Sequence, residues 1–125
     1  MNKIDIYSPH IYVAGPIGKK ERHADNLQAA IDAAEALYRM GAIPIVPHFF
    51  IPWGEKHEHA YEEWMTLDFE IVRRADALYR MPGISPGADR EVAFAEEQRI
   101  VVLTSLKDVE RFVETYRDGM RREVG

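Results

Sequence analysis

The sequence lacks cysteine altogether and contains no long apolar run. The absence of cysteine excludes a disulfide framework, a thiol nucleophile and a zinc–thiolate site. The first ten residues, MNKIDIYSPH, are too polar for a signal peptide, and no apolar stretch approaches the length of a membrane span. From these absences we expect a cytoplasmic protein that has no membrane partner.

Positive charge is also scarce. The chain has 16 lysines and arginines against 21 aspartates and glutamates, a formal net charge of −5. This balance argues against binding of long nucleic acid through a basic face, whereas small anionic ligands remain compatible with it. Hydrophobic residues make up 46% of the 125 residues, as is ordinary for a globular protein. We expect one domain over residues 1–125 that buries a core without disulfides.

The hydrophobic pattern predicts strands that alternate with helices. The expected strands are 10–15, 42–47, 77–81 and 100–104. The expected helices are about 23–40, 58–75, 86–99 and 106–122, and a long aromatic loop follows the second strand. Alternation of this kind implies parallel strands joined by right-handed crossovers, hence a small doubly wound α/β sheet.

Three loops leave the carboxyl ends of the expected strands. They are AGPIGKK, PHFFIPWG and PGISPG, which lie at 14–20, 47–54 and 82–87. Ligands of open α/β sheets bind at this edge, near the topological switch point. We therefore expect the three loops to converge on one crevice.

Glu91 is the first candidate for chemistry in that crevice. Ser85 is a good N-cap residue and Pro86 suits the first helical position, so a helix is expected to begin there. At about 100° per residue, Glu91 falls on the packed face of this helix. The residues that share its stripe are Gly87, Ala88, Val92 and Ala95. Either Glu91 is half exposed and serves the helix dipole, or it is a buried functional carboxylate.

Asp68 is a second inward carboxylate, on the helix expected over 58–75. Its stripe at helical spacing consists of Tyr61, Trp64, Met65, Asp68, Ile71, Val72 and Ala75. A buried carboxylate needs a partner or is driven to protonate. One interpretation is that Asp68 accepts hydrogen bonds from backbone N–H groups of a neighbouring loop. The other is that Asp68 and Glu91 act together as nucleophile and general acid or base, an arrangement typical of glycosidic bond cleavage.

The segment before Glu91 also suggests an anion site. Ser85 and Gly87 lie at the start of a helix whose first N–H groups and positive dipole end can receive a phosphate. Asp89 adds negative charge nearby, which Arg90 or the basic run 19–22 could offset. The phosphorylation state of a substrate is therefore left open.

The histidines show no familiar metal-binding spacing. His48, His57 and His59 flank the aromatic loop. His23 either reaches the crevice or, as the preferred interpretation, is a partly buried structural residue. We expect no metal and no cofactor.

These residues resemble the nucleoside 2-deoxyribosyltransferase-like superfamily, which includes nucleoside 5′-monophosphate N-glycosidases and an uncharacterised branch of phage and bacterial genomes. The resemblance covers residues 11–103, and the spacing of Ser85, Gly87 and Glu91 is its most telling part. The segments that carry it are YVAGPI at 12–17, Asn26, VP at 46–47, WMTLD at 64–68, ADAL at 75–78 and PGISPGADRE at 82–91. The resemblance implies a flavodoxin-like or Rossmann-like sheet of four or five strands.

The resemblance also implies a role for each matching residue. Glu91 matches the nucleophile that attacks the anomeric carbon, Tyr12 a tyrosine that orients it, and Asp68 an aspartate that protonates the leaving base or contacts the sugar. Ser85 matches the serine that holds the 5′-phosphate in monophosphate-cleaving members. The expected substrate-binding residues are Gly15, Pro16, Ile17, Asn26, His48, Ser85, Gly87 and Ala88.

Three functions follow as hypotheses. The first is hydrolysis of the N-glycosidic bond of a (deoxy)nucleoside 5′-monophosphate, and the second is transfer of the same glycosyl group to another base. The third is a non-catalytic nucleotide-binding module, in which inward Asp68 and Glu91 would be unnecessary. Three roles are open for the aromatic residues of the loop, Phe49, Phe50 and Trp53: stacking on a nucleobase, a subunit contact, or packing under the loop. We expect a homodimer or homotetramer, because related enzymes assemble and this loop is rich in apolar surface.

Overall fold

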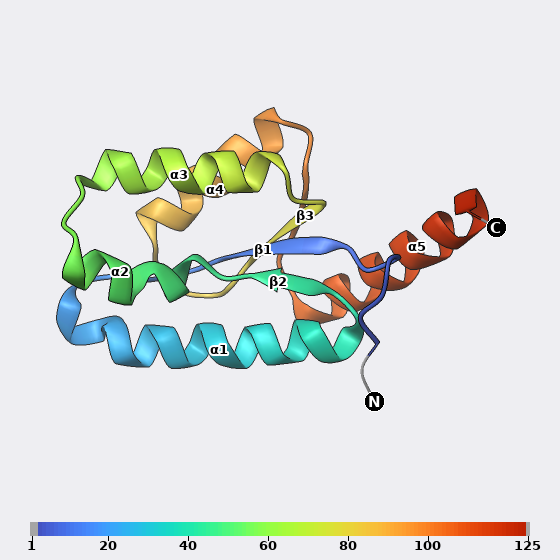
Figure 1. Ribbon diagram of the computed structural model, residues 1–125, viewed down its shortest axis with the longest axis horizontal. Helices are drawn as coiled ribbons and strands as arrows, with labels where there is room; N and C mark the ends of the chain where they lie inside the picture. The colour runs from blue at the N-terminus through green and yellow to red at the C-terminus, as the bar shows by residue number, and fades with distance from the viewer. Residues whose placement is uncertain (1–2, 125) are drawn as a thin grey trace.

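The computed structural model describes residues 3–124 and contains a sheet of four parallel strands (Figure 1). The strands are β1 (His10–Ala14), β2 (Ile43–Ile45), β3 (Ala77–Arg80) and β4 (Val101–Leu103), in the order β2-β1-β3-β4. The helices are η1 (Lys20–Arg22), α1 (His23–Met40), η2 (Pro47–Phe50), α2 (Ile51–Lys56), α3 (Tyr61–Arg73), α4 (Pro86–Glu97) and α5 (Leu106–Val124). The expectation of a small parallel α/β sheet is confirmed.

Side chains of β1 alternate between the two faces of the sheet and so divide the core in two. Ile11 and Val13 pack on the face that α1 and α5 cover. Tyr12 and Ala14 pack on the opposite face, under α3 and α4, which lie together above the sheet in Figure 1. All four side chains are fully buried, so β1 is the centre of the molecule.

The switch point of the sheet lies between β1 and β3. From β1 the chain passes through α1 to β2 on one side, and from β2 it passes through α3 to β3 on the other side. Ala14 pairs with Arg80 in the register, so the loops that follow β1 and β3 start next to each other. A Cβ on Gly15 would lie only 2.8 Å from Sδ of Met81. The two loops therefore touch, and glycine permits their close approach.

The aromatic loop that the sequence predicted contains the helices η2 and α2. Proline stands in the first turn of each helix, where its missing N–H costs nothing. The helix expected from residue 58 begins at Tyr61, because the backbone N–H of Ala60 donates to Oε1 of Glu63 at 2.9 Å and caps the start. Strand β2 has three residues in place of the expected six, and Pro44 is tolerated in it because β2 is an edge strand.

None of the helices between residues 3 and 124 combines the length and the apolar character that a membrane crossing requires.

Candidate active site

A buried hydrogen bond joins the middle of β1 to α4. The Tyr12 hydroxyl donates to Oε2 of Glu91, across 79 positions of sequence. Tyr12 is fully buried, and Glu91 exposes only 5% of its surface. The predicted inward orientation of Glu91 is therefore confirmed, and its half-exposed alternative is wrong.

Asp68 reaches the same place from α3. It exposes 7% of its surface and interacts with both Tyr12 and Glu91. Its Oδ1 atom is buried and has no hydrogen-bond partner among residues 3–124. The alternative in which loop N–H groups satisfy Asp68 finds no support in these contacts. Two carboxyl groups and one phenol from three different elements thus meet under the switch point.

Burial perturbs the protonation of all three groups. It raises the pKa of Glu91, and the nearby charge of Asp68 adds to this rise, while the hydrogen bond from Tyr12 opposes it. Burial likewise raises the pKa of Asp68. The pKa of Tyr12 is raised well above its ordinary value by burial and by the two carboxylates. The pair of carboxyl groups therefore holds a proton to higher pH than two exposed carboxyl groups would.

The serine of the opening turn of α4 acts as a helix cap. Ser85 is buried, and its Oγ accepts a hydrogen bond from the backbone N–H of Ala88 at 3.1 Å. This confirms the predicted N-cap. Gly87 follows, and a Cβ there would lie 3.3 Å from the hydroxyl of Tyr61. The Tyr61 side chain, which comes from α3, thus covers the first turn of α4.

Three side chains support the loop that follows β1. Nε2 of His48 lies 3.0 Å from the carbonyl oxygen of Pro16, Nδ2 of Asn26 donates to the carbonyl oxygen of Ile17 at 2.8 Å, and Nε2 of His23 lies 3.0 Å from that of Gly18. His48 is fully buried, and burial lowers its pKa. These residues hold the loop in place, while their direct contact with a substrate stays a prediction.

Arg80 is the residue of this region that sequence reasoning missed. It ends β3, and its guanidinium pairs with Asp89 at 2.9 Å. The expectation that Arg90 offsets Asp89 is wrong, because Arg90 instead binds Glu62 on the outer side of α3 and α4. The ion pair of Asp89 is made by Arg80, which neither candidate anticipated. The sequence feature that could have identified Arg80 is its charge at the end of the buried strand ALYR.

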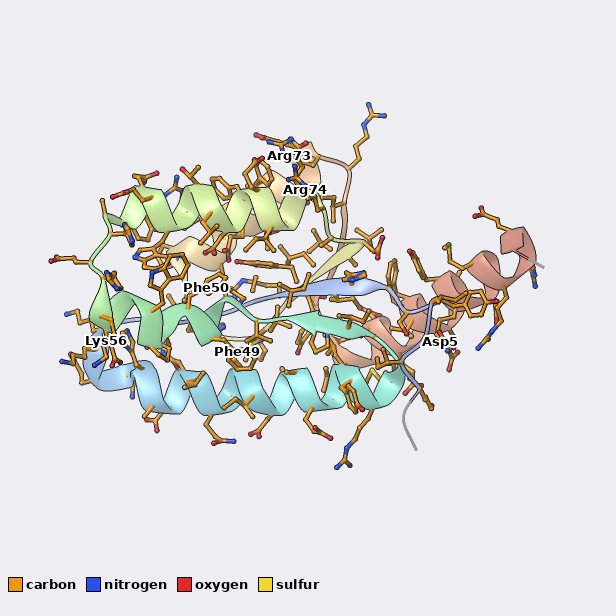
Figure 2. The ribbon with its side chains drawn as sticks, viewed as in Figure 1. Asp5, Phe49, Phe50, Lys56, Arg73 and Arg74 are labelled. Carbon is orange, nitrogen blue, oxygen red and sulfur yellow. The ribbon has the colours of Figure 1, made fainter. Side chains whose placement is uncertain are left out.

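An aromatic cluster of Phe50, Trp53, His59 and Trp64 packs α2 against the start of α3. Its tightest contact is edge-to-face, with ring centroids of Trp53 and Trp64 5.0 Å apart. Phe50 lies on the side of η2 that faces α3 and Phe49 on the side that faces α1 (Figure 2). Phe49 and Trp53 remain about half exposed. In the part of the chain that the structure describes, no three His, Asp or Glu side chains gather as metal ligands would.

The fold and these contacts define the protein as a doubly wound α/β protein with a buried pair of carboxyl groups at its switch point. Residues 9–104 match the family described as "Domain of unknown function (DUF4406)", and the chain belongs to that family. The matched range contains Tyr12, Asp68 and Glu91. No curated protein matches the sequence.

Solved structures share the fold at low sequence identity. A 2-deoxyribosyltransferase from Bacillus psychrosaccharolyticus has a TM-score of 0.53 at 20% identity, over 74% of this chain and 69% of its own. A conserved protein from Enterococcus faecalis V583 has a TM-score of 0.62 at 23% identity, over 76% of this chain and 61% of its own. A 2-deoxyribosyltransferase from Leishmania mexicana has a TM-score of 0.56 at 22% identity, over 77% of this chain and 63% of its own. The chain thus spans less than two thirds of the length of the last two, and the likeness establishes the nucleoside 2-deoxyribosyltransferase-like fold.

Proposed function

We propose that the protein breaks the N-glycosidic bond of a (deoxy)nucleoside and transfers the sugar through a covalent intermediate on Glu91. The observation that carries this proposal is the buried contact of Glu91 with Tyr12, with Asp68 beside both. Two similarly folded proteins are named 2-deoxyribosyltransferases, which supports the same chemistry here.

The two carboxyl groups divide the reaction between them. The ionised carboxylate of Glu91 attacks the anomeric carbon, the bond from that carbon to the base nitrogen breaks, and the nitrogen keeps the electron pair. Burial raises the pKa of both carboxyl groups, and that of Glu91 further, so the two share a proton. In the reactive form Asp68 carries this proton and gives it to the departing base. A second base or water then attacks the anomeric carbon of the glycosyl ester and gives its proton to the Asp68 carboxylate, and the bond from that carbon to the Glu91 oxygen breaks, so that Glu91 is released as a carboxylate. The Tyr12 hydroxyl occupies Oε2 of Glu91 and so leaves Oε1 for the attack.

Transfer between unphosphorylated nucleosides fits the contacts better than hydrolysis of a 5′-monophosphate, the first hypothesis from the sequence. A phosphate at the first turn of α4 would meet the carboxylate of Asp89, whose side chain is 70% exposed. The N–H of Ala88 is bonded to Ser85, and Arg80 and Arg90 both have carboxylate partners. Little positive potential is therefore left for a phosphate there.

The test is a panel of nucleosides and their 5′-monophosphates, each incubated with and without a second free base. Chromatography then follows released base and newly formed nucleoside. We expect exchange of bases on nucleosides, weak release from monophosphates, and loss of both activities by orders of magnitude in Glu91→Gln and Asp68→Asn. Glu96→Gln, an exposed change on the same helix, is the matched control and should remain active.

Intact mass spectrometry with a slow 2-fluoro nucleoside should detect a sugar adduct on the wild-type protein and none on Glu91→Gln. Binding of nucleosides without any turnover would instead support the non-catalytic module. An adduct on another residue would refute the assignment of Glu91.

A further inference from the structure

The Arg80 guanidinium connects the end of β3 with the start of α4. Nη1 donates to the carbonyl oxygen of Met81, and Nη2 donates at 2.9 Å both to the carbonyl oxygen of Gly83 and to Oδ1 of Asp89. Nε lies 3.3 Å from the same Oδ1. Only 15% of the Arg80 side chain is exposed. Such forked contacts of arginine are directional, so the group holds its partners in one arrangement.

The segment that Arg80 binds is the loop between β3 and α4. Gly83 has φ of 112° in this loop, and a Cβ there would lie 3.0 Å from Cγ of Pro16. The loop thus lies against the loop that follows β1. Asp89 belongs to the first turn of α4, two residues before Glu91. Arg80 thus binds the turn of α4 that precedes Glu91, the partner of Tyr12.

Arg80 also contributes charge. The groups that face Glu91 are Tyr12 from β1, Asp68 from α3 and Arg80 from β3. Burial and the charge of Asp68 raise the pKa of Glu91, whereas the charge of Arg80 lowers it. On α4 itself, Asp89 is bound by Arg80.

The neighbouring Arg90 lies on another side of the same helix. It forms a two-pronged ion pair with Glu62, at 2.8 and 3.1 Å, and its guanidinium stands over the rings of Tyr61 and Phe69. Arg90 thus joins α3 to α4 at their outer seam and is a natural control for a charge that acts on Glu91.

We propose that Arg80 is a positioning residue for Glu91, which fixes the first turn of α4 and supplies a positive charge that favours the ionised carboxylate. This inference rests on the proposed role of Glu91 as the nucleophile.

The test compares the pH dependence of kcat/KM for base release in the wild type and three variants. Arg80→Gln removes the charge, so the acid limb of the profile should move to higher pH by roughly half to one pH unit. Arg80→Lys keeps the charge without the fork, so the limb should stay near the wild-type position while kcat/KM falls at every pH. Arg90→Gln should leave the limb in place.

A fourth variant tests the direction of the electrostatic effect on the acid limb. Asp89→Asn removes a negative charge beside Arg80, so the acid limb should move to lower pH. Loss of rate in Arg80→Gln without a shift of the limb would overturn the proposal, because it would show that the charge of Arg80 does not act on Glu91. An equal shift in Arg90→Gln would also overturn it.

A measurement without substrate separates this proposal from the proposed function. The carboxyl carbon of Glu91 is followed by ¹³C NMR in glutamate-labelled protein, and its signal is assigned by its absence in Glu91→Gln. Its titration midpoint should rise in Arg80→Gln and fall in Asp89→Asn. If the wild type released no base from any nucleoside, the proposed function would fail, while an unchanged midpoint in Arg80→Gln would refute the role of Arg80 by itself.

Discussion

Replacement of Glu91 by glutamine should stabilise the fold and abolish turnover at the same time. Burial raises the pKa of Glu91, so the folded state binds this proton more tightly than the unfolded chain. The stability that the bound proton contributes is complete below the ordinary glutamate pKa of about 4.3 and is lost as the pH rises through the folded-state pKa. Above that value the ionised carboxylate destabilises the native protein.

The size of the effect follows from the shift. Each unit by which the folded-state pKa exceeds the unfolded value corresponds to about 1.4 kcal/mol. Glutamine keeps the shape of glutamate, and its amide oxygen can accept the hydrogen bond from the Tyr12 hydroxyl. We therefore expect Glu91→Gln to raise the free energy of unfolding at pH 8 to 9 by at least about 1.4 kcal/mol. For a chain of this size the melting temperature should rise by about 3–6 °C per kcal/mol.

The assay is thermal or urea unfolding of the wild type, Glu91→Gln and Glu96→Gln between pH 4 and pH 9, together with base release. The gain in the free energy of unfolding of Glu91→Gln should vanish near pH 4, where the wild-type carboxyl group is largely protonated in both the folded and the unfolded state. Glu96 is exposed, so its variant should stay within about 0.5 kcal/mol of the wild type. A Glu91→Gln protein that is less stable than the wild type at pH 8, or that still releases base, would refute the reasoning.

Three further predictions concern the surroundings of the site. Ser85→Ala should lower the free energy of unfolding by about 1 kcal/mol, because the N–H of Ala88 loses its cap, and should reduce turnover of nucleosides and monophosphates alike; a loss confined to monophosphates would show that Ser85 binds phosphate instead. Arg99→Gly should stabilise the protein by about 0.5 to 1 kcal/mol in urea unfolding, because Arg99 has φ of 60°; a loss of stability would count against strain there. Light scattering at micromolar concentration should give a dimeric or tetrameric mass, since Phe49 and Trp53 are half exposed, and a monomeric mass would contradict this.

Several features of the fold and site could be predicted from local sequence. The inward faces of the two site helices followed from periodicity, because an α-helix turns by a fixed angle per residue whatever its neighbours are. Asp68 and Glu91 were therefore recognised as buried carboxyl groups, and both are buried. Ser85 was recognised as an N-cap because capping depends on only four consecutive residues. The order of strands and helices predicted the parallel sheet for a similar reason.

Other features depended on long-range packing. The segment 51–56 contains proline and glycine and reads as a loop, yet it forms α2, and the edge-to-face contact of Trp53 with Trp64 of α3 stabilises it. Local propensity carries no information about such a contact. In the same way, residue types alone made Arg90 and the basic run 19–22 the candidates to offset Asp89, whereas the structure pairs Asp89 with Arg80. Neighbouring side chains on a helix point about 100° apart, so Asp89 meets β3 while Arg90 meets α3.

The sequence by itself determined which side chains are turned inward and which segments begin and end the main helices, since both depend on short-range geometry. Only the tertiary structure decided that Tyr12, Asp68 and Glu91 meet, because their contact requires β1, α3 and α4 to assemble around the switch point. It also decided their protonation, since a carboxyl group acquires a raised pKa only when the packed chain removes water from around it. The placement of Arg80 beside them has the same origin, in the order of the strands.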